Sequence, residues 1–214
     1  MAEIDHIVIG ARTLDEGAAY VEAHLGARPV MGGKHEGIGT HNMVLGLGPE
    51  CYLEVIAADP DQPEPPHPRP FDLDDPATRL MLEAGPHLLG WVARTPALEA
   101  MAARLGASQA GEVKAWKRGT LSWRMATPPQ RQDMRNIIPS LIQWDDGKGA
   151  GPILADSGCR LLSLEAEHPD FDAVGNALRQ RGLDEALKLR RSPHPRLVAR
   201  LARADGTEVA LSSG

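Results

Sequence analysis

The chain has 214 residues, of which 42% are hydrophobic and 24% charged, and its formal net charge is −6. This size and composition suit one large soluble domain or a few small modules. The acidic balance argues against nucleic acid or an anionic membrane as a partner, and no apolar run approaches the roughly 20 residues of a membrane span.

The N-terminus and the cysteines bear on where the protein works. The first residues lack a basic segment followed by an apolar one, so they do not resemble a secretory signal. Cys51 and Cys159 stand far apart in the sequence and fit no metal or redox spacing. We therefore expect a cytoplasmic protein with reduced cysteines.

The first predicted unit covers residues 1–58. Alternating residues predict a strand over 4–9, and Thr13-Leu-Asp-Glu16 is a capping box that predicts a helix over 14–25. Gly26 stands where a left-handed cap would end that helix. Strands are predicted at 27–31, 40–47 and 51–57, with breaks at Gly32-Gly33 and Gly46–Gly48.

The second unit repeats the first. A proline-rich acidic stretch predicts a surface linker over 59–85, with one short helix at 77–83. The motif Ala11-Arg-Thr13 then returns as Ala93-Arg-Thr95, and Leu25-Gly-Ala27 returns as Leu105-Gly-Ala107. Such a repeat indicates a duplicated strand–helix–strands unit, here over residues 86–147, with a strand at 88–93, a helix at 96–105 and strands at 113–117, 121–126 and 140–144.

A third, weaker copy follows a glycine-rich connector at 148–158. Its predicted elements over 159–214 are a strand at 160–167, a helix at 171–181 and strands at 187–191, 197–203 and 208–212. The sequence thus predicts an α+β protein of three βαβββ modules, the first two paired into a curved, cup-like sheet. Because exposed sheet edges are normally covered, we expect the third module to dock on the others or to form a homodimer.

Two residues of the first module are candidates for chemistry. If Ile7, Ile9, Leu53 and Val55 pack under the helix, His6 and Glu54 share the concave face of the sheet. A His and a Glu that converge in a cleft suit a divalent metal or an acid–base pair. Alternatively, both are outward-facing residues without a role.

A glycine-rich stretch lies between the second and third predicted strands. His35 and His41 flank Gly37-Ile-Gly39, which suits either an anion-contacting loop or an ordinary hairpin turn. Asn42 alternates with His41, so only one of them can face the cleft, and the small neighbours on the side of Asn42 favour Asn42.

The motifs together resemble a known superfamily. Asp5-His-Ile-Val-Ile9, Gly32–Asn42, Tyr52-Leu-Glu-Val-Ile56 and Leu141-Ile-Gln-Trp144 are similar to the glyoxalase-like branch of the vicinal oxygen chelate superfamily. This resemblance implies paired βαβββ modules with metal ligands on their first and last strands. It points to His6, Glu54, His87 and Gln143 as ligands of Zn, Mn, Ni or Fe. His87 faces the cleft only if its strand slips by one residue, since a slip reverses the face.

The later strands of the second module are basic. They carry Trp116 and Trp123 and the cations Lys114, Lys117, Arg118, Arg124, Arg131 and Arg135. A cleft with Arg and Trp suits a small carboxylate, whereas a solvated hairpin would hold the same residues without a function.

The resemblance implies a metal-dependent lyase, isomerase or dioxygenase that acts on a small oxygen-bearing, anionic molecule. Glu54 or Gln143 would relay the proton, and Asn42, Arg118, Arg124 and Trp123 would bind the substrate. The alternative from another class is a metal-free protein of the same fold that sequesters a small molecule, and fold alone does not choose between them.

Overall fold

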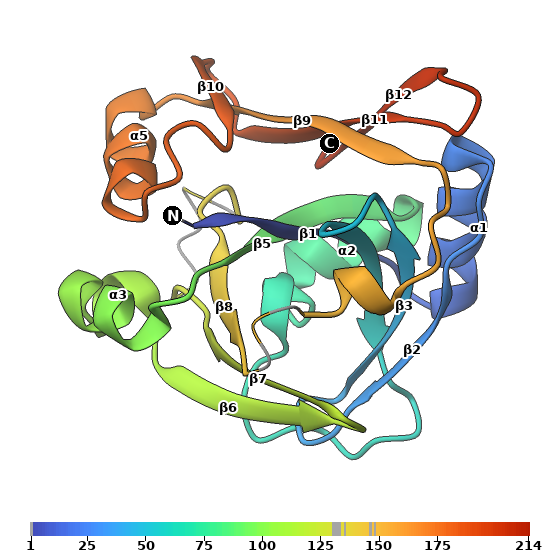
Figure 1. Ribbon diagram of the computed structural model, residues 1–214, viewed down its shortest axis with the longest axis horizontal. Coiled ribbons are helices and arrows are strands. Elements are labelled where there is room, and N and C mark those ends of the chain that lie inside the picture. Colours follow the sequence, from blue (N-terminus) through green and yellow to red (C-terminus); the bar gives the residue numbers. More distant parts are fainter. Residues whose placement is uncertain (1, 130–133, 135, 146, 148) are drawn as a thin grey trace.

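The computed structural model describes residues 2–129, 134, 136–145, 147 and 149–214 (Figure 1). Their elements in chain order are β1 (Glu3–Gly10), α1 (Leu14–Leu25), β2 (Val30–His35), β3 (Thr40–Gly46), β4 (Tyr52–Ala58), the 3-10 turn η1 (Pro70–Asp72), α2 (Pro76–Ala84), β5 (His87–Arg94), α3 (Leu98–Leu105), α4 (Ala107–Ala110), β6 (Val113–Arg118), β7 (Leu121–Ala126), β8 (Ser140–Trp144), the 3-10 turn η2 (Gly151–Ile153), β9 (Arg160–His168), α5 (Phe171–Gln180), β10 (Lys188–Arg191), β11 (Arg196–Ala202) and β12 (Glu208–Ser212).

The first two units form one eight-stranded sheet. Its strand order is β2-β3-β4-β1-β5-β8-β7-β6, so each unit contributes four strands in mirrored order around the β1–β5 pair. In each unit the first strand runs parallel to the last. The sheet curls until the edge strands β2 and β6 come into contact, which makes a nearly closed cup (Figure 1). The predicted α+β class and cup-like pairing are confirmed.

Local sequence signals explain the first unit well. The Thr13 hydroxyl accepts a hydrogen bond from the backbone N–H of Glu16, and Gly26 ends α1 with a φ of 71°, as the capping box and the terminal glycine predict. Along β1, Ile7 and Ile9 join the core outside the cup. Val8 joins the core inside it. The alternation of β1 therefore places His6, the neighbour of Val8 on the same face, toward the interior.

The second strand begins later than predicted and passes through the expected break. Pro29 has no backbone N–H to donate to a ladder, and β2 starts at Val30 after it. Gly32 and Gly33 lie inside β2, where the register with β3 shifts between Met31 and Gly33. A bulge of this kind tolerates the φ of 149° at Gly33, so the glycine pair bends the strand instead of ending it.

The proline-rich segment does more than link the two units. Phe71 and Leu73 are buried and belong to the apolar cluster inside the cup, together with Leu82 of α2. Arg69 is 6% exposed, and its guanidinium donates to the carbonyl of Gly39 and pairs with Glu64 and Asp74. The segment was predicted as a surface linker. It also packs against the cup and contributes residues to its core.

The third unit has the predicted order of elements but its own order of strands. Its sheet runs β10-β9-β11-β12, with β9 between β10 and β11. In the first two units, by contrast, the last strand lies beside the first. Cross-strand partners of opposite charge favour the observed parallel pairing of β9 and β10, because Lys188 faces Glu165 and Arg190 faces Glu167.

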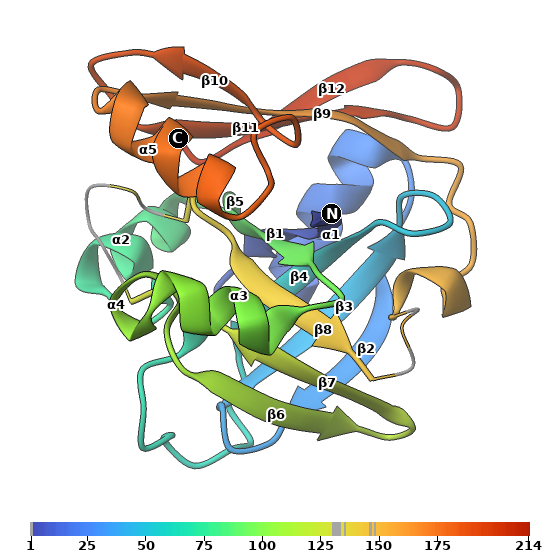
Figure 2. The ribbon, with the colours of Figure 1, turned by 60° about the vertical axis from the view of Figure 1, so that its left-hand side comes forward.

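This second sheet docks on the outside of the cup. Both ribbon views show β9, β11 and β12 lying over β1 and β5 (Figures 1 and 2). Leu164, Leu197 and Leu211 pack into the same core as Trp91 of β5 and Ile7 of β1. The expected docking on the first two modules is therefore observed. The division of the chain into modules at the stated boundaries stays a prediction.

No helix in the described part of the chain is long and apolar enough to cross a membrane.

Candidate functional site

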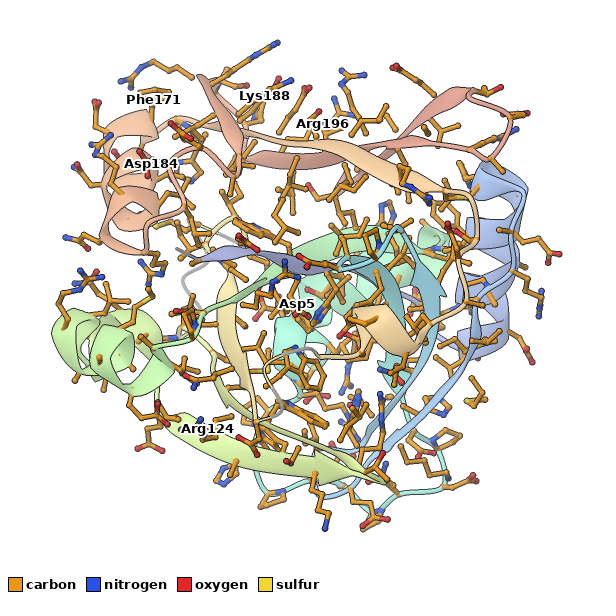
Figure 3. All side chains as sticks on the ribbon, in the orientation of Figure 1. Asp5, Arg124, Phe171, Asp184, Lys188 and Arg196 are labelled. Carbon is orange, nitrogen blue, oxygen red and sulfur yellow. The ribbon has the colours of Figure 1, made fainter. Side chains whose placement is uncertain are left out.

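A bulge in β1 organises the site. The register between β1 and β5 shifts between Ile4 and His6, so Asp5 and His6 do not simply alternate. The Nδ1 of His6 lies 2.6 Å from Oδ1 of Asp5, and the indole N–H of Trp144 donates to the other Asp5 oxygen at 2.9 Å. Figure 3 shows Asp5 in the middle of the molecule. A buried carboxylate therefore orients the imidazole of His6.

The other side of His6 faces Glu54. The Nε2 of His6 lies 3.4 Å from Oε2 of Glu54, and the ring of Tyr52 stacks on the imidazole with centroids 4.5 Å apart. The amide of Asn42 donates to Oε1 of Glu54 at 2.6 Å. All four side chains are buried. The structure thus brings together the predicted pair His6 and Glu54, and places Asn42 with them.

Arg118 and His35 complete the network at the seam of the cup. The guanidinium of Arg118 donates to the Asn42 carbonyl oxygen at 2.9 Å and approaches Nε2 of His35 at 3.4 Å. The paired glycines make room for these contacts. A Cβ on Gly32 would lie 2.2 Å from Oδ1 of Asn42, and one on Gly33 would lie 2.9 Å from Cδ of Arg118.

The pair carries opposite charges. Burial lowers the pKa of His6, but hydrogen bonds and charges from Asp5 and Glu54 outweigh it and raise the pKa to about 9. Burial raises the pKa of Glu54, but His6, His35 and Asn42 outweigh it and lower the pKa to about 2. Near pH 7 the site therefore holds an imidazolium facing a carboxylate.

His35 has the opposite tendency to His6. Burial lowers its pKa, and the charges of Arg118 and His6 lower it further despite the opposing charge of Glu54. A neutral His35 accepts from Arg118 through Nε2 and donates from Nδ1 to the Thr40 hydroxyl, 2.9 Å away. The site therefore contains one charged and one neutral histidine near the carboxyl groups of Asp5 and Glu54.

The predicted contributions of the second module lie elsewhere. His87 pairs with Gly10 at the far end of β1, whereas His6 is opposite Val92. Gln143 points out of the cup, where its Oε1 accepts the backbone N–H of Leu98 at the start of α3. The structure does not bring either residue to His6, because the inward residues of β8 are Ile142 and Trp144. The register of β8 thus differs by one residue from the predicted one.

The predicted substrate residues of β7, Trp123 and Arg124, lie on opposite faces of the sheet. Trp123 is buried inside the cup beside Trp144, with ring centroids 5.3 Å apart. Arg124 is its neighbour on the outer face, where it pairs with Glu99 of α3 and with Asp145, and Figure 3 shows it away from Asp5. Arg131 and Arg135 lie outside the described residues.

The donor set does not fit a metal held by four protein ligands. In the described part of the chain, no group of three or more His, Cys, Asp or Glu side chains is placed to hold an ion. On β5 and β8, the two strands of the second module nearest His6, the described residues that point into the cup are Val92, Ile142 and Trp144. None of these has a lone pair that a divalent ion would accept as a ligand.

Three residues of the network had no clear sequence signal. Asp5 turns inward because of a bulge, which the alternation of β1 does not reveal. Trp144 reaches Asp5 across 139 positions of sequence. His35 was noted beside its glycine-rich turn, but its contact with Arg118 depends on the closure of β2 against β6. Each depends on tertiary geometry more than on local pattern.

Comparisons with known proteins place this geometry in context. A family model described as "Glyoxalase-like domain" matches residues 4–187. A solved structure of a hypothetical protein from Staphylococcus aureus aligns with 100% of this chain and 87% of its own, at 16% identity and a TM-score of 0.57. No curated protein matches the sequence.

Two solved epimerases are more distant. Methylmalonyl-CoA epimerase in complex with methylmalonyl-CoA and NH4+ covers 70% of this chain and 99% of its own, at 16% identity and a TM-score of 0.47. The methylmalonyl-CoA epimerase from Mycobacterium tuberculosis covers 66% of this chain and 86% of its own, at 19% identity and a TM-score of 0.40. At such similarity neither informs about the activity of this chain.

Proposed function

The chain belongs to the glyoxalase-like domain family, and from the charged pair inside its cup we propose that it is a proton-transferring enzyme of the isomerase or lyase type. Its substrate would be a small oxygen-bearing anion. The single observation that carries this proposal is the contact between His6 and Glu54, 3.4 Å apart and both buried. Neighbouring groups push their pKa values in opposite directions, as in acid–base pairs that divide one reaction between them.

The protonation states assign the roles. Glu54, ionised, would take a proton from a carbon next to a carbonyl group of the substrate. His6, protonated on Nε2, would donate to the oxygen on which negative charge develops. Asp5 would keep the imidazole charged and oriented through Nδ1. The separation of 3.4 Å between Nε2 of His6 and Oε2 of Glu54 exceeds the usual hydrogen-bond length of about 2.9 Å. The Nε2 proton is therefore only weakly hydrogen-bonded to Glu54.

Arg118 supplies the preference for an anion. Among the described residues, its guanidinium contacts the neutral groups Asn42 and His35 at the site, and both Arg118 and His35 are partly exposed. A substrate carboxylate would take a charge-assisted hydrogen bond from it. Asn42, which contacts both Arg118 and Glu54, would then couple anion binding to the position of the base. We assign no role to Arg124.

A hydrogen-exchange assay tests the proposal. Pyruvate and 2-oxobutyrate, which carry acidic C–H bonds beside a carbonyl, are incubated with the protein in D2O and followed by proton NMR. We expect wild-type protein to accelerate loss of the C–H signal for at least one of them, and Glu54→Gln and His6→Gln to lower that rate at least about 100-fold. The matched control is Glu99→Gln, because Glu99 is an exposed carboxylate on α3.

The same assay distinguishes the proposed enzyme from the rival function, which is the sequestering of a small molecule. A metal-free sequestering protein is favoured by one observation, that the polar groups of the pair are already partnered within the protein. Such a protein would bind one of these anions without exchanging its protons. Binding that depends on Arg118 but shows no exchange in wild-type protein would replace the enzyme proposal with the sequestering one.

Proton transfer here would need no metal ion, because the described residues of the second module bring no further ligand to His6 and Glu54. Protein incubated with Zn, Mn, Ni or Fe(II) should therefore exchange protons at the same rate as chelator-treated protein. A rate that rises with metal and is abolished by both His6→Gln and Glu54→Gln would return the metal-dependent mechanism implied by the superfamily.

A further inference from the structure

A second cavity lies away from the His6–Glu54 pair. It has a volume of about 700 Å³ and lies between α5 of the third unit, the α4 region of the second unit and the proline-rich segment. This volume is in the range of small-molecule sites, about 300–1,000 Å³. Its described lining includes an apolar wall formed by Phe71, Met134, Ile138 and Ala173.

A buried cation, Arg181, lines this cavity, and the acidic residue Asp72 lines it as well. Arg181 is 1% exposed. Two of its nitrogens donate to backbone carbonyls, NH1 to Ala177 at 2.8 Å and NH2 to Gln109 at 2.7 Å. Its Nε is buried and has no hydrogen-bond partner. Within the described residues no ion pair neutralises the guanidinium, and burial accordingly lowers its pKa.

The two carbonyl bonds explain only part of this arrangement. They tie the end of α5 to the end of α4, and the negative end of a helix favours a cation. They leave the Nε nitrogen without a partner, however, and a buried charge without a counter-ion is costly. Arg69, the other cation of the lining, differs because Glu64 and Asp74 already neutralise it.

We propose that this cavity is a second binding site, for a small amphipathic carboxylate whose head group pairs with Arg181 and whose apolar tail lies along Phe71, Met134 and Ile138. A carboxylate supplies the missing negative charge to the guanidinium. Contact between the tail and the apolar wall removes apolar surface from water, which favours binding. None of the residues of the His6–Glu54 network lines this site, so the inference stands whether or not the proton-transfer proposal is right.

Octanoate is the probe, and octanamide is the matched neutral control. Isothermal titration calorimetry on the full chain should show one saturable site for octanoate. Octanamide should bind at least tenfold more weakly. Arg181→Met should lower octanoate affinity at least tenfold, whereas Arg191→Met, an exposed arginine paired with Asp172, should leave it unchanged.

A second variant guards against misfolding of Arg181→Met. Ala173 is half-buried on α5 and lines the cavity, so Ala173→Leu should fill part of it and abolish binding while Arg181 stays in place. The inference is overturned if octanoate does not bind, if octanamide binds as well, or if Ala173→Leu binds like wild type. It is also overturned if Arg118→Met abolishes binding and Arg181→Met does not, because octanoate would then bind inside the cup.

Discussion

Replacing Glu54 with Gln should change how the stability of the fold depends on pH. The substitution keeps the shape of the side chain but removes its charge. In wild-type protein the pKa of His6 rises from 6.5 to about 9. At 1.36 kcal/mol per pKa unit, this difference corresponds to about 3 kcal/mol of stability.

The sign follows from the direction of each change. Because the pKa of His6 is raised on folding, its contribution is complete below pH 6.5 and is lost as the pH climbs through 9. The pKa of Glu54 is lowered, so its contribution is complete above pH 4.5 and is lost only as the pH falls toward 2. Of the two groups in this pair, therefore, only His6 loses its contribution between pH 6 and 9.5.

Urea denaturation followed by tryptophan fluorescence at several pH values measures this loss. Wild-type protein should lose about 3 kcal/mol of unfolding free energy between pH 6 and 9.5. Glu54→Gln should lose less than about half of that, because only Asp5 then raises the pKa of His6. The control Glu99→Gln should follow wild type. Equal losses in wild type and Glu54→Gln would refute the electrostatic coupling of the pair.

Further substitutions test the placement of single residues. Gly33→Ala should weaken binding of a substrate anion about tenfold, because the new Cβ would lie 2.9 Å from Cδ of Arg118. The control in the same binding titration is Gly37→Ala, whose new Cβ would have no atom within 4 Å. Gln143→Ala should cost about 1 kcal/mol in urea denaturation, since α3 loses a cap, with proton exchange unchanged; lost exchange at full stability would contradict this placement. His87→Ala should alter neither metal content nor exchange, and a loss of either would place it in the site.

Much of the fold was predictable because its signals are local. Thr13 and Gly26 fix the two ends of α1 by hydrogen bonds within a few residues, and the repeated Ala-Arg-Thr motif indicates the second unit. The strand order of the third sheet was not predictable in this way. The same sequence of elements permits the last strand or the second strand to lie beside the first, and the choice depends on pairs such as Lys188 and Glu165.

The positions of the candidate site residues agree with the sequence pattern only in the first module. The alternation of β1 and β4 placed His6 and Glu54 on one face, and small neighbours favoured Asn42 over His41. In the second module the register of β8 differs by one residue from the expected register, and Trp144 instead of Gln143 points inward. A period-two pattern gives no warning of such a slip when both faces of a strand are buried.

A direct NMR titration of His6 tests the central claim, that the cup encloses a charged acid–base pair. The protein is labelled with 15N-histidine, treated with chelator, and its imidazole signals are followed from pH 5 to 10, with His6→Gln for assignment. We expect His6 to stay protonated on both nitrogens at pH 7 and to titrate near pH 9. A His6 that is neutral at pH 7 and titrates below its ordinary value of 6.5 would contradict it.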